Sequence, residues 1–106
     1  MASYSEWRSY TEKDVRANAP ATAGVYMLRV KSKDDGRQII YVGQASNLRE
    51  RLLDHLSSNE PNECLRARQK YTVQYCWIEI SREKERDYEE RAKIAKYQPK
   101  CNTQGK

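Results

Sequence analysis

The chain has 106 residues, which leaves room for one small domain and little else. Only 38% of the residues are hydrophobic and Phe is absent, so we expect a thin core in which Tyr and Trp supply much of the volume. The formal net charge of +5 favours a polyanionic partner. The N-terminus has no apolar signal region and no stretch approaches the length of a membrane span, so we expect a cytoplasmic protein without membrane contact.

The cysteine and histidine content argues against two common ways of stabilising a small domain. Cys64, Cys76 and Cys101 form no C-x-x-C pair, and one histidine is too few for a Cys/His zinc cluster of the usual spacing. An odd number of cysteines also argues against a closed disulfide framework. We therefore expect three reduced thiols, as in a cytosolic protein.

The first part of the chain predicts a β-hairpin preceded by a short arm. Residues 5–16 are charged and predict a short helix or an irregular arm, which ends at Pro20. Residues 24–30 and 38–43 are rich in Val, Ile and Tyr, which predicts two strands. The connection between them is polar and holds an Asp-Gly turn signal at residues 35–36, so we expect the two strands to pair.

A helix is predicted directly after the second strand. Asn47, followed by Glu50 three residues later, resembles a capping box and predicts a helix start at this point. Leucines recur every fourth residue over residues 48–56 and predict a stripe that faces the core. Arg51 and His55 lie one turn apart along the edge of that stripe, so we expect both at the core boundary, where they can reach into a cleft.

The second part of the chain predicts one more strand and a long helix. Residues 63–70 favour a short basic helix, and residues 71–80 alternate as a strand with one apolar set on each face. Ser81 is expected to cap a long helix that ends at Pro99. Glu90 lies in the middle of this helix.

The order and spacing of these residues resemble the GIY-YIG nuclease superfamily. In chain order, the matching residues are Gly24-Val25-Tyr26, Tyr41-Val42-Gly43 after fourteen residues, Arg51 after seven, His55 after three, and then Glu90, Pro99 and Asn102. Each residue alone has an ordinary explanation in a strand, helix or turn, and only the ordered set carries the resemblance. The match covers residues 23–102. We expect an N-terminal arm or short helix over residues 1–22 and a nuclease domain over residues 23–106.

The resemblance implies both a fold and an activity. The fold is a small α/β (α+β) domain with a mixed or antiparallel three-stranded sheet flanked by helices. The activity is hydrolysis of DNA phosphodiester bonds by a divalent-metal-dependent endonuclease. The alternative is a module with the same fold that binds nucleic acid or protein without cutting. Since the chain has no obvious DNA-reading domain, we expect specificity to come from DNA structure, a homodimer or a targeting partner.

Five residues are expected to carry the chemistry that the resemblance implies. Glu90 holds a single Mg²⁺, with Mn²⁺ as a substitute, and waters fill most of the remaining coordination sites. Tyr26 takes a proton from the attacking water, and Tyr41 positions the water or the phosphate, with the division of labour between the two phenols left open. Because a free phenol has a pKa of about 10, the metal or Arg51 must favour its phenolate form. Arg51 also stabilises the pentacovalent phosphate, and His55 binds phosphate or assists the leaving group.

Eight further residues are expected to support the site or to bind DNA. The supporting residues are Gly24, Gly43, Gln44 and Asn102. The expected contacts to backbone phosphate are Arg29, Lys31, Arg49 and Lys93, although each is also an ordinary surface charge. Many relatives carry Lys where this chain has Gln44. An amide can hydrogen-bond a phosphate but carries no charge, so we expect a lower affinity or rate without loss of catalysis.

Overall fold

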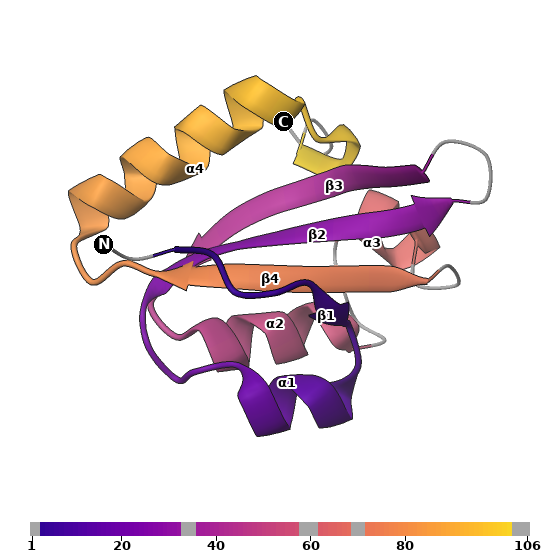
Figure 1. Ribbon diagram of the computed structural model, residues 1–106, viewed down its shortest axis with the longest axis horizontal. Coiled ribbons are helices and arrows are strands. Elements are labelled where there is room, and N and C mark those ends of the chain that lie inside the picture. The colour runs from indigo at the N-terminus through magenta and orange to yellow at the C-terminus, as the bar shows by residue number, and fades with distance from the viewer. Residues whose placement is uncertain (1–2, 33–35, 58–61, 69–71, 103–106) are drawn as a thin grey trace.

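The computed structural model describes residues 3–32, 36–57, 62–68 and 72–102. In chain order the elements are β1 (Arg8–Ser9), α1 (Glu12–Asn18), β2 (Gly24–Ser32), β3 (Gly36–Ala45), α2 (Leu48–Leu56), α3 (Glu63–Arg68), β4 (Val73–Glu79), α4 (Glu83–Tyr97) and a single 3₁₀ turn, η1 (Lys100–Asn102) (Figure 1). The predicted turn between the first two long strands falls on residues 33–35 and lies outside the described residues.

The described strands form one antiparallel sheet in the order β1-β4-β2-β3. The predicted small α/β domain with an antiparallel sheet flanked by helices is therefore confirmed, and none of these pairings is parallel. The expectation of three strands changes in one respect, because the N-terminal arm adds the two-residue strand β1 beside β4. Strand β3 pairs only with β2 and forms an edge of the sheet.

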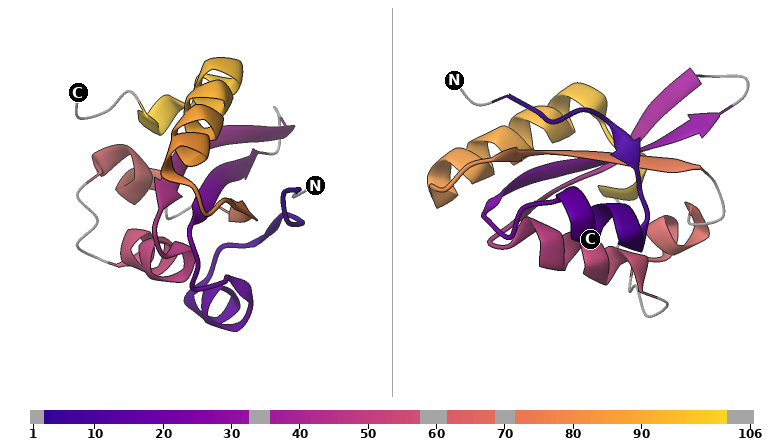
Figure 2. Two further views of the ribbon diagram at one scale, coloured as in Figure 1. Left: turned by 90° about the vertical axis from the view of Figure 1, so that its left-hand side faces the viewer. Right: turned by 60° about the horizontal axis from the view of Figure 1, so that its bottom comes forward.

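Helices cover both faces of the sheet and divide the core into two clusters. Figure 2 shows α4 on one side of the sheet and α1 and α2 on the other. The larger cluster lies on the α2 side and includes Tyr26, Leu28, Leu48, Leu52 and Tyr75. The smaller cluster lies on the α4 side and includes Val25, Met27, Val42, Cys76 and Ile78. Within the described residues, no helix combines the length and apolar character needed to cross a membrane.

A β-bulge decides which way the side chains of β3 point. The register between β2 and β3 shifts and leaves Ile40 as an extra residue in β3. Ile40 and its neighbour Tyr41 therefore both face the α2-side core, whereas Ile39 and Val42 face the α4-side core. Without the extra residue, strict alternation would place Tyr41 on the α4 side. The bulge thus brings Tyr41 to the same face as Tyr26.

The caps of the two longest helices differ in how well the sequence predicts them. The predicted cap of α2 is confirmed, because the Asn47 side chain accepts a hydrogen bond of 3.0 Å from the backbone N–H of Glu50. The predicted cap of α4 by Ser81 is wrong, since Arg82 occupies the cap position and makes no capping bond with its side chain. The Ser81 carbonyl instead accepts a hydrogen bond from the guanidinium of Arg86, one turn into the helix.

Two of the three cysteines form a disulfide bond. Cys64 in α3 and Cys101 in η1 are joined, with their Cα atoms 5.3 Å apart, and Cys76 is a buried free thiol. The expectation of three reduced thiols is therefore wrong. The two partners are separated by 37 positions in sequence, and they meet only because α3 and η1 pack together, which no local pattern predicts.

The N-terminal arm is bound to the domain by buried and half-buried contacts. The guanidinium of Arg8 donates to the carboxylate of Asp14 at 2.8 Å, and the Tyr75 hydroxyl donates to the same carboxylate at 2.6 Å. The hydroxyl of Tyr10 donates to the backbone carbonyl of Leu52 in α2 at 2.5 Å. Residues 8–14 are thus tied both to the sheet and to the helix that carries Arg51 and His55.

Candidate active site

A buried phenol and a buried imidazole form the centre of the candidate site. Tyr26 in β2 is 1% exposed, and His55 near the end of α2 is 3% exposed. The Tyr26 hydroxyl lies 2.6 Å from Nε2 of His55, which is a short hydrogen bond. In the neutral imidazole that carries its proton on Nδ1, Nε2 accepts this bond and the Tyr26 hydroxyl donates it. The two residues predicted from distant parts of the sequence are therefore direct partners.

Tyr41 completes a cluster of three rings on the α2 side of the sheet. Its ring centroid lies 6.1 Å from that of Tyr26 and 5.3 Å from that of His55, with the edge of one ring toward the face of the other in the second pair. Tyr41 is half-buried, unlike the other two rings. The cluster therefore has two buried members and one that also borders solvent at the edge strand.

The glycines of the two triplets allow the backbone and the rings to approach closely. Gly43 lies directly across from Tyr26 in the β2–β3 pairing. A Cβ atom at Gly43 would overlap the phenol ring of Tyr26, so the ring lies over the β3 backbone only because this position has no side chain. A Cβ atom at Gly24 would similarly meet the carbonyl of Ile78 in the neighbouring strand β4. Gly43 is therefore required by the Tyr26 ring, and Gly24 by the close approach of strand β4.

Burial shifts the ionisation of Tyr26 in the opposite direction to the one expected from sequence. Desolvation raises the pKa of Tyr26 well above its usual value, and the neighbouring Tyr41 raises it further. The positive charge of Arg51 lowers this pKa, as expected, but burial is the larger effect. The Tyr26 phenol of the metal-free protein is therefore protonated near neutral pH, and it can lose its proton only to a partner.

Arg51 lies one turn before His55 on α2 and borders a small surface hollow. The hollow has a volume of about 240 Å³ and lies at the start of α2. Its lining residues are Ala45, Ser46, Asn47, Glu50, Arg51 and Asp54. Arg51 is half-buried and is the one cation among them. Arg51 therefore borders this hollow, and its positive charge lowers the pKa of Tyr26 in the ring cluster.

Glu90 reaches the candidate site from the other face of the sheet. It lies on α4, and its Oε1 accepts a hydrogen bond of 3.0 Å from the side-chain amide of Gln44 in β3. The same amide nitrogen donates to Asp87, one turn earlier on α4, at 2.5 Å. Gln44 thus points to the α4 side, whereas Tyr41 and Gly43 of the same strand face the ring cluster. The five predicted catalytic residues form two groups that meet along edge strand β3.

Asn102 occupies the free edge of β3. Its side-chain amide donates to the Val42 carbonyl at 2.8 Å, and its Oδ1 accepts from the Val42 N–H at 2.8 Å. These two bonds imitate the pairing of a further strand, and they satisfy backbone groups that an edge strand otherwise leaves open. Asn102 therefore holds η1 against the segment that carries Tyr41, Gly43 and Gln44.

The donors around Glu90 suit an ion that keeps most of its water. Among the described residues, no group of three or more His, Cys, Asp and Glu side chains is arranged to hold a metal ion. Glu90 is half-buried with Asp87 beside it, and carboxylate oxygens are hard donors. Mg²⁺ commonly takes one or two carboxylates and retains several waters, so the residues present fit such an ion.

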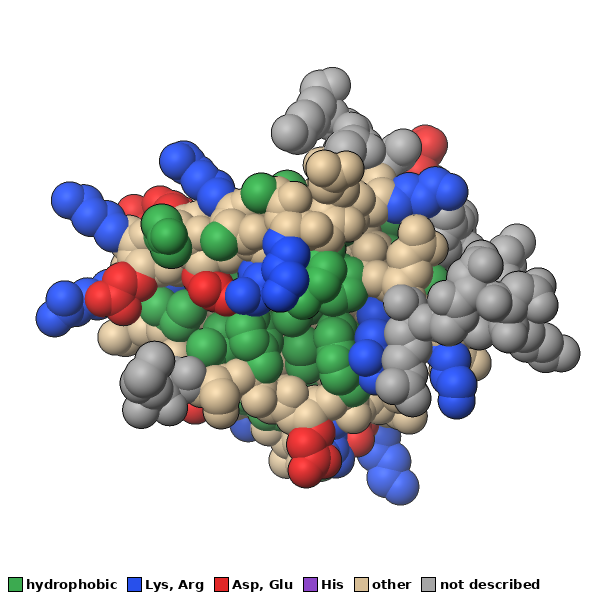
Figure 3. Space-filling model, turned by 45° about the horizontal axis from the view of Figure 1, so that its top comes forward, with side chains coloured by type: hydrophobic (Ala, Val, Ile, Leu, Met, Phe, Trp, Pro, Cys, Tyr) green, Lys and Arg blue, Asp and Glu red, His purple; other side chains and the backbone are tan. Residues whose placement is uncertain are grey.

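The four cations predicted to contact DNA do not gather on one face. Arg29 lies over the ring of Trp7 at 4.0 Å and donates to Gln74, and Lys93 pairs with Glu89 at 3.1 Å, both on the α4 side. Figure 3 shows hydrophobic side chains gathered on that side of the molecule with cations at their margin. Lys31 is exposed on β2. Arg49 lies on α2 and donates to the Ala19 carbonyl.

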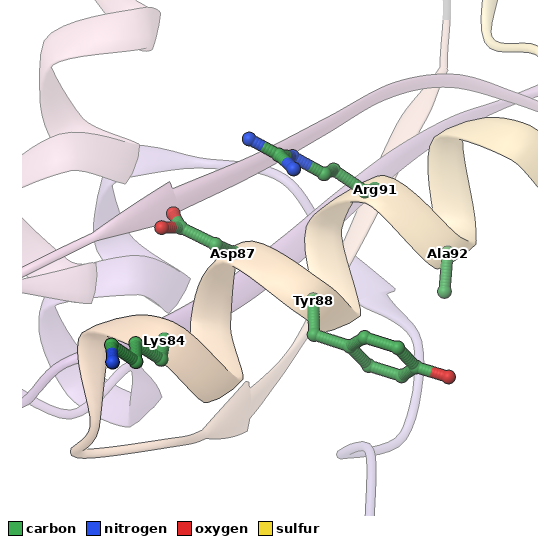
Figure 4. A pocket seen from close by; sticks show the side chains of 5 residues that line it. All are labelled: Lys84, Asp87, Tyr88, Arg91 and Ala92. Atoms are coloured by element: carbon green, nitrogen blue, oxygen red, sulfur yellow. The ribbon is translucent and has the colours of Figure 1, made fainter.

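Sequence reasoning missed two residues beside Glu90. Asp87 accepts a hydrogen bond from the side-chain amide nitrogen of Gln44, and Nε of the buried Arg86 lies 3.4 Å from the amide oxygen of Gln44. Figure 4 shows Asp87 and Arg91 pointing to the same side of α4, with Tyr88 pointing away from them. The only sequence signal was the spacing of Asp87, three residues before Glu90, which places both on one helix face.

Comparisons with known proteins support the resemblance along most of the chain. The family model for the UvrC-like GIY-YIG domain matches residues 22–103. The UvrABC system protein C of Rickettsia rickettsii is 36% identical over 88 residues, which cover 80% of this chain and 12% of that protein. The corresponding protein of Caldicellulosiruptor saccharolyticus is 34% identical over 92 residues, covering 87% of this chain and 15% of that protein. The chain therefore spans only about an eighth of the length of these relatives.

A solved structure shows the same fold at similar length. The GIY-YIG N-terminal endonuclease domain of UvrC from Thermotoga maritima, bound to its catalytic divalent cation magnesium, superposes with a TM-score of 0.61 and 30% identity. The superposition covers 84% of this chain and 91% of that domain. A variant of that domain bound to its catalytic divalent cation gives a TM-score of 0.60 at 29% identity.

Proposed function

The chain belongs to the UvrC-like GIY-YIG domain family, and from this premise we propose that it is a divalent-metal-dependent endonuclease that hydrolyses DNA phosphodiester bonds. The observation that carries the proposal is the arrangement along edge strand β3. The hydrogen-bonded pair of Tyr26 and His55 lies on one face of this strand, and Glu90, held by Gln44, lies on the other. A phosphate at this edge would therefore meet a proton acceptor, a cation from Arg51 and a metal-binding carboxylate.

Glu90 is the residue that holds the metal in this proposal. The ion is Mg²⁺, with Mn²⁺ as a substitute, and it supplies positive charge at the phosphate and makes water more acidic. Glu90 contributes one carboxylate from a helix, which is a rigid mount, and Gln44 fixes one of its oxygens. The carboxylate is therefore already oriented before an ion binds, so little ordering entropy is lost on binding.

Tyr26 and His55 move the proton of the attacking water. As Tyr26 takes a proton from this water, its own proton passes along the 2.6 Å hydrogen bond to Nε2, and His55 becomes an imidazolium. The water oxygen bonds to phosphorus, the bond from phosphorus to one sugar oxygen breaks, and that oxygen takes a proton from solvent. Burial raises the pKa of Tyr26 and so disfavours a free phenolate. Because Tyr26 gives its proton to His55 as it accepts the proton of the water, no free phenolate has to form.

Arg51 and Tyr41 face the phosphate from the ring side of the strand. The guanidinium of Arg51 stabilises the charge that develops on the phosphoryl oxygens, and losing one such contact costs about 3–4 kcal/mol of activation free energy. Tyr41 is half-buried, so its hydroxyl can orient the water or the phosphate while its ring packs against His55.

Cleavage of DNA by the purified chain tests the proposal. Supercoiled plasmid, single-stranded DNA and branched DNA are each incubated with Mg²⁺ or with a chelator, and the nicked and cut products are measured. We expect Mg²⁺-dependent products from the wild type, and a loss of at least about 100-fold in Glu90→Gln. Glu85→Gln removes the same charge from an exposed position of the same helix and is expected to cleave normally.

The same assay separates an enzyme from a binding module. DNA binding that is independent of metal, with no product from any DNA form, would support the alternative that the fold binds without cutting. A single site cuts one strand at a time, so cutting of both strands requires two copies or two events. Because contacts to backbone phosphate carry no sequence information, we place the choice of DNA target with a partner, a second copy or the structure of the DNA.

A further inference from the structure

The Gln44 side chain joins two carboxylates at the candidate metal site. Its Nε2 donates to Oδ1 of Asp87 at 2.5 Å and to Oε1 of Glu90 at 3.0 Å. Both carboxylate oxygens therefore lie within 3.0 Å of one nitrogen. The two hydrogens of a primary amide are enough to serve both acceptors at once. Gln44 thus acts as a bridge that brings a second carboxylate close to Glu90.

The orientation of this bridge is fixed from the other end. Oε1 of Gln44 faces Nε of Arg86 at 3.4 Å. Arg86 is 9% exposed, and its NH1 donates to the backbone carbonyls of Ile80 and Ser81 at 3.2 Å and 2.8 Å. If the amide were flipped, its oxygen would face the two carboxylates and its NH₂ group would face the guanidinium of Arg86. Both contacts would be repulsive. The amide is therefore held with its donors toward Asp87 and Glu90.

We propose that Gln44 and Asp87 form the outer shell of the divalent-metal site on Glu90, an inference that rests on the proposed function. Gln44 is a positioning residue that fixes the Glu90 carboxylate. Asp87 accepts hydrogen bonds from the waters of the ion and adds a second negative charge to the site. Ligating carboxylates are commonly held by such outer partners, and an ion that keeps its waters needs acceptors for them.

The neutral amide gives this site a different balance of charge from a lysine at the same position. A lysine ammonium could also donate to both carboxylates, but it would place a positive charge beside the bound cation. Gln44 orders the two carboxylates without neutralising either of them, so both charges remain available to the ion. The neutral amide is thus expected to favour metal binding more than a lysine at this position would.

Titration of the full chain with Mn²⁺ tests the inference independently of activity. Free Mn²⁺ is followed by electron paramagnetic resonance for the wild type and for four variants. We expect Asp87→Asn and Gln44→Met each to weaken Mn²⁺ binding by about 10- to 100-fold. Glu90→Gln is expected to abolish binding, and Glu85→Gln, a control of equal charge change, is expected to leave it unchanged.

The outcomes distinguish this inference from the function on which it rests. Suppose that Asp87→Asn or Gln44→Met binds Mn²⁺ as tightly as the wild type, while Glu90→Gln does not bind it. The outer-shell proposal is then wrong, and the metal site on Glu90 stands. Wild-type affinity in Glu90→Gln overturns the metal site itself. Thermal unfolding checks that each variant is folded. If Gln44→Met does not fold, Asp87→Asn decides alone, because Asp87 is half-exposed and the change conserves its shape.

Discussion

Burial of the Tyr26 phenol links the chemistry of the site to the stability of the fold. Its pKa is raised in the folded protein, chiefly by desolvation. In the unfolded chain the pKa returns to about 10. The neutral phenol therefore contributes stability that is fully present below about pH 10 and is lost as the pH rises toward the folded pKa.

The expected result is a stability that falls at alkaline pH and falls less in Tyr26→Phe. Urea denaturation from about pH 8 to about pH 11 measures the free energy of unfolding of both proteins. Burial also raises the pKa values of Tyr4, Tyr75 and Cys76, so only the difference between the two proteins reports on Tyr26. Parallel curves for wild type and variant would show that Tyr26 is not the residue responsible.

Gly43 has no side chain, and this leaves the space that the Tyr26 ring occupies. Gly43→Ala forces the ring or the strand to move, and such overpacking costs about 1–3 kcal/mol. We expect a lower free energy of unfolding and slower DNA cleavage. Ser9→Ala, at an exposed position of strand β1, is the control. Wild-type stability and cleavage in Gly43→Ala would contradict the close approach of backbone and ring.

The sequence predicts individual candidate residues better than it predicts their partners. Tyr26, His55 and Glu90 follow from order and spacing along the chain. The contact between Tyr26 and His55, and the shared amide of Gln44, follow from packing between elements distant in sequence. Asp87 carried no signal beyond its spacing from Glu90, because any helix with many charges contains such pairs.

At the scale of elements, edge strand β3 organises the site. The bulge at Ile40 turns Tyr41 toward the ring cluster, and regular alternation after the bulge points Gln44 toward α4. A continuous apolar run predicts a buried strand but contains no sign of where an extra residue breaks the alternation. The helix cap at Asn47 could be predicted because the cap is local, whereas Ser81 lies one residue outside the cap position, which Arg82 occupies.

The disulfide between α3 and η1 gives a prediction about stability. Cross-links over 37 positions of sequence remove unfolded-state entropy worth about 4 kcal/mol in the chain-entropy model. We expect a reducing agent to lower the free energy of unfolding by about 2–4 kcal/mol, measured by urea denaturation. Cys64→Ser is expected to be insensitive to the reductant. An equal response of wild type and Cys64→Ser would show that no such bond forms in solution.

At the scale of the whole molecule, the fold brings two separate groups to one edge of the sheet. The ring cluster belongs to the α2 side and Glu90 to the α4 side. The class of fold could be predicted because the ordered motif resembles a family of known fold, while local patterns placed the three long strands and the helices. The fourth strand could not, because β1 has two residues and forms only beside β4.

The single-turnover rate of DNA cleavage in Mg²⁺ tests most directly whether the two groups act on one phosphodiester. Tyr26→Phe alters the group on one face of β3 and Glu90→Gln alters the group on the other. We predict that each change lowers the rate by at least about 100-fold, while the affinity for DNA, measured in Ca²⁺, stays close to that of the wild type. Wild-type cleavage by either variant would contradict the shared site.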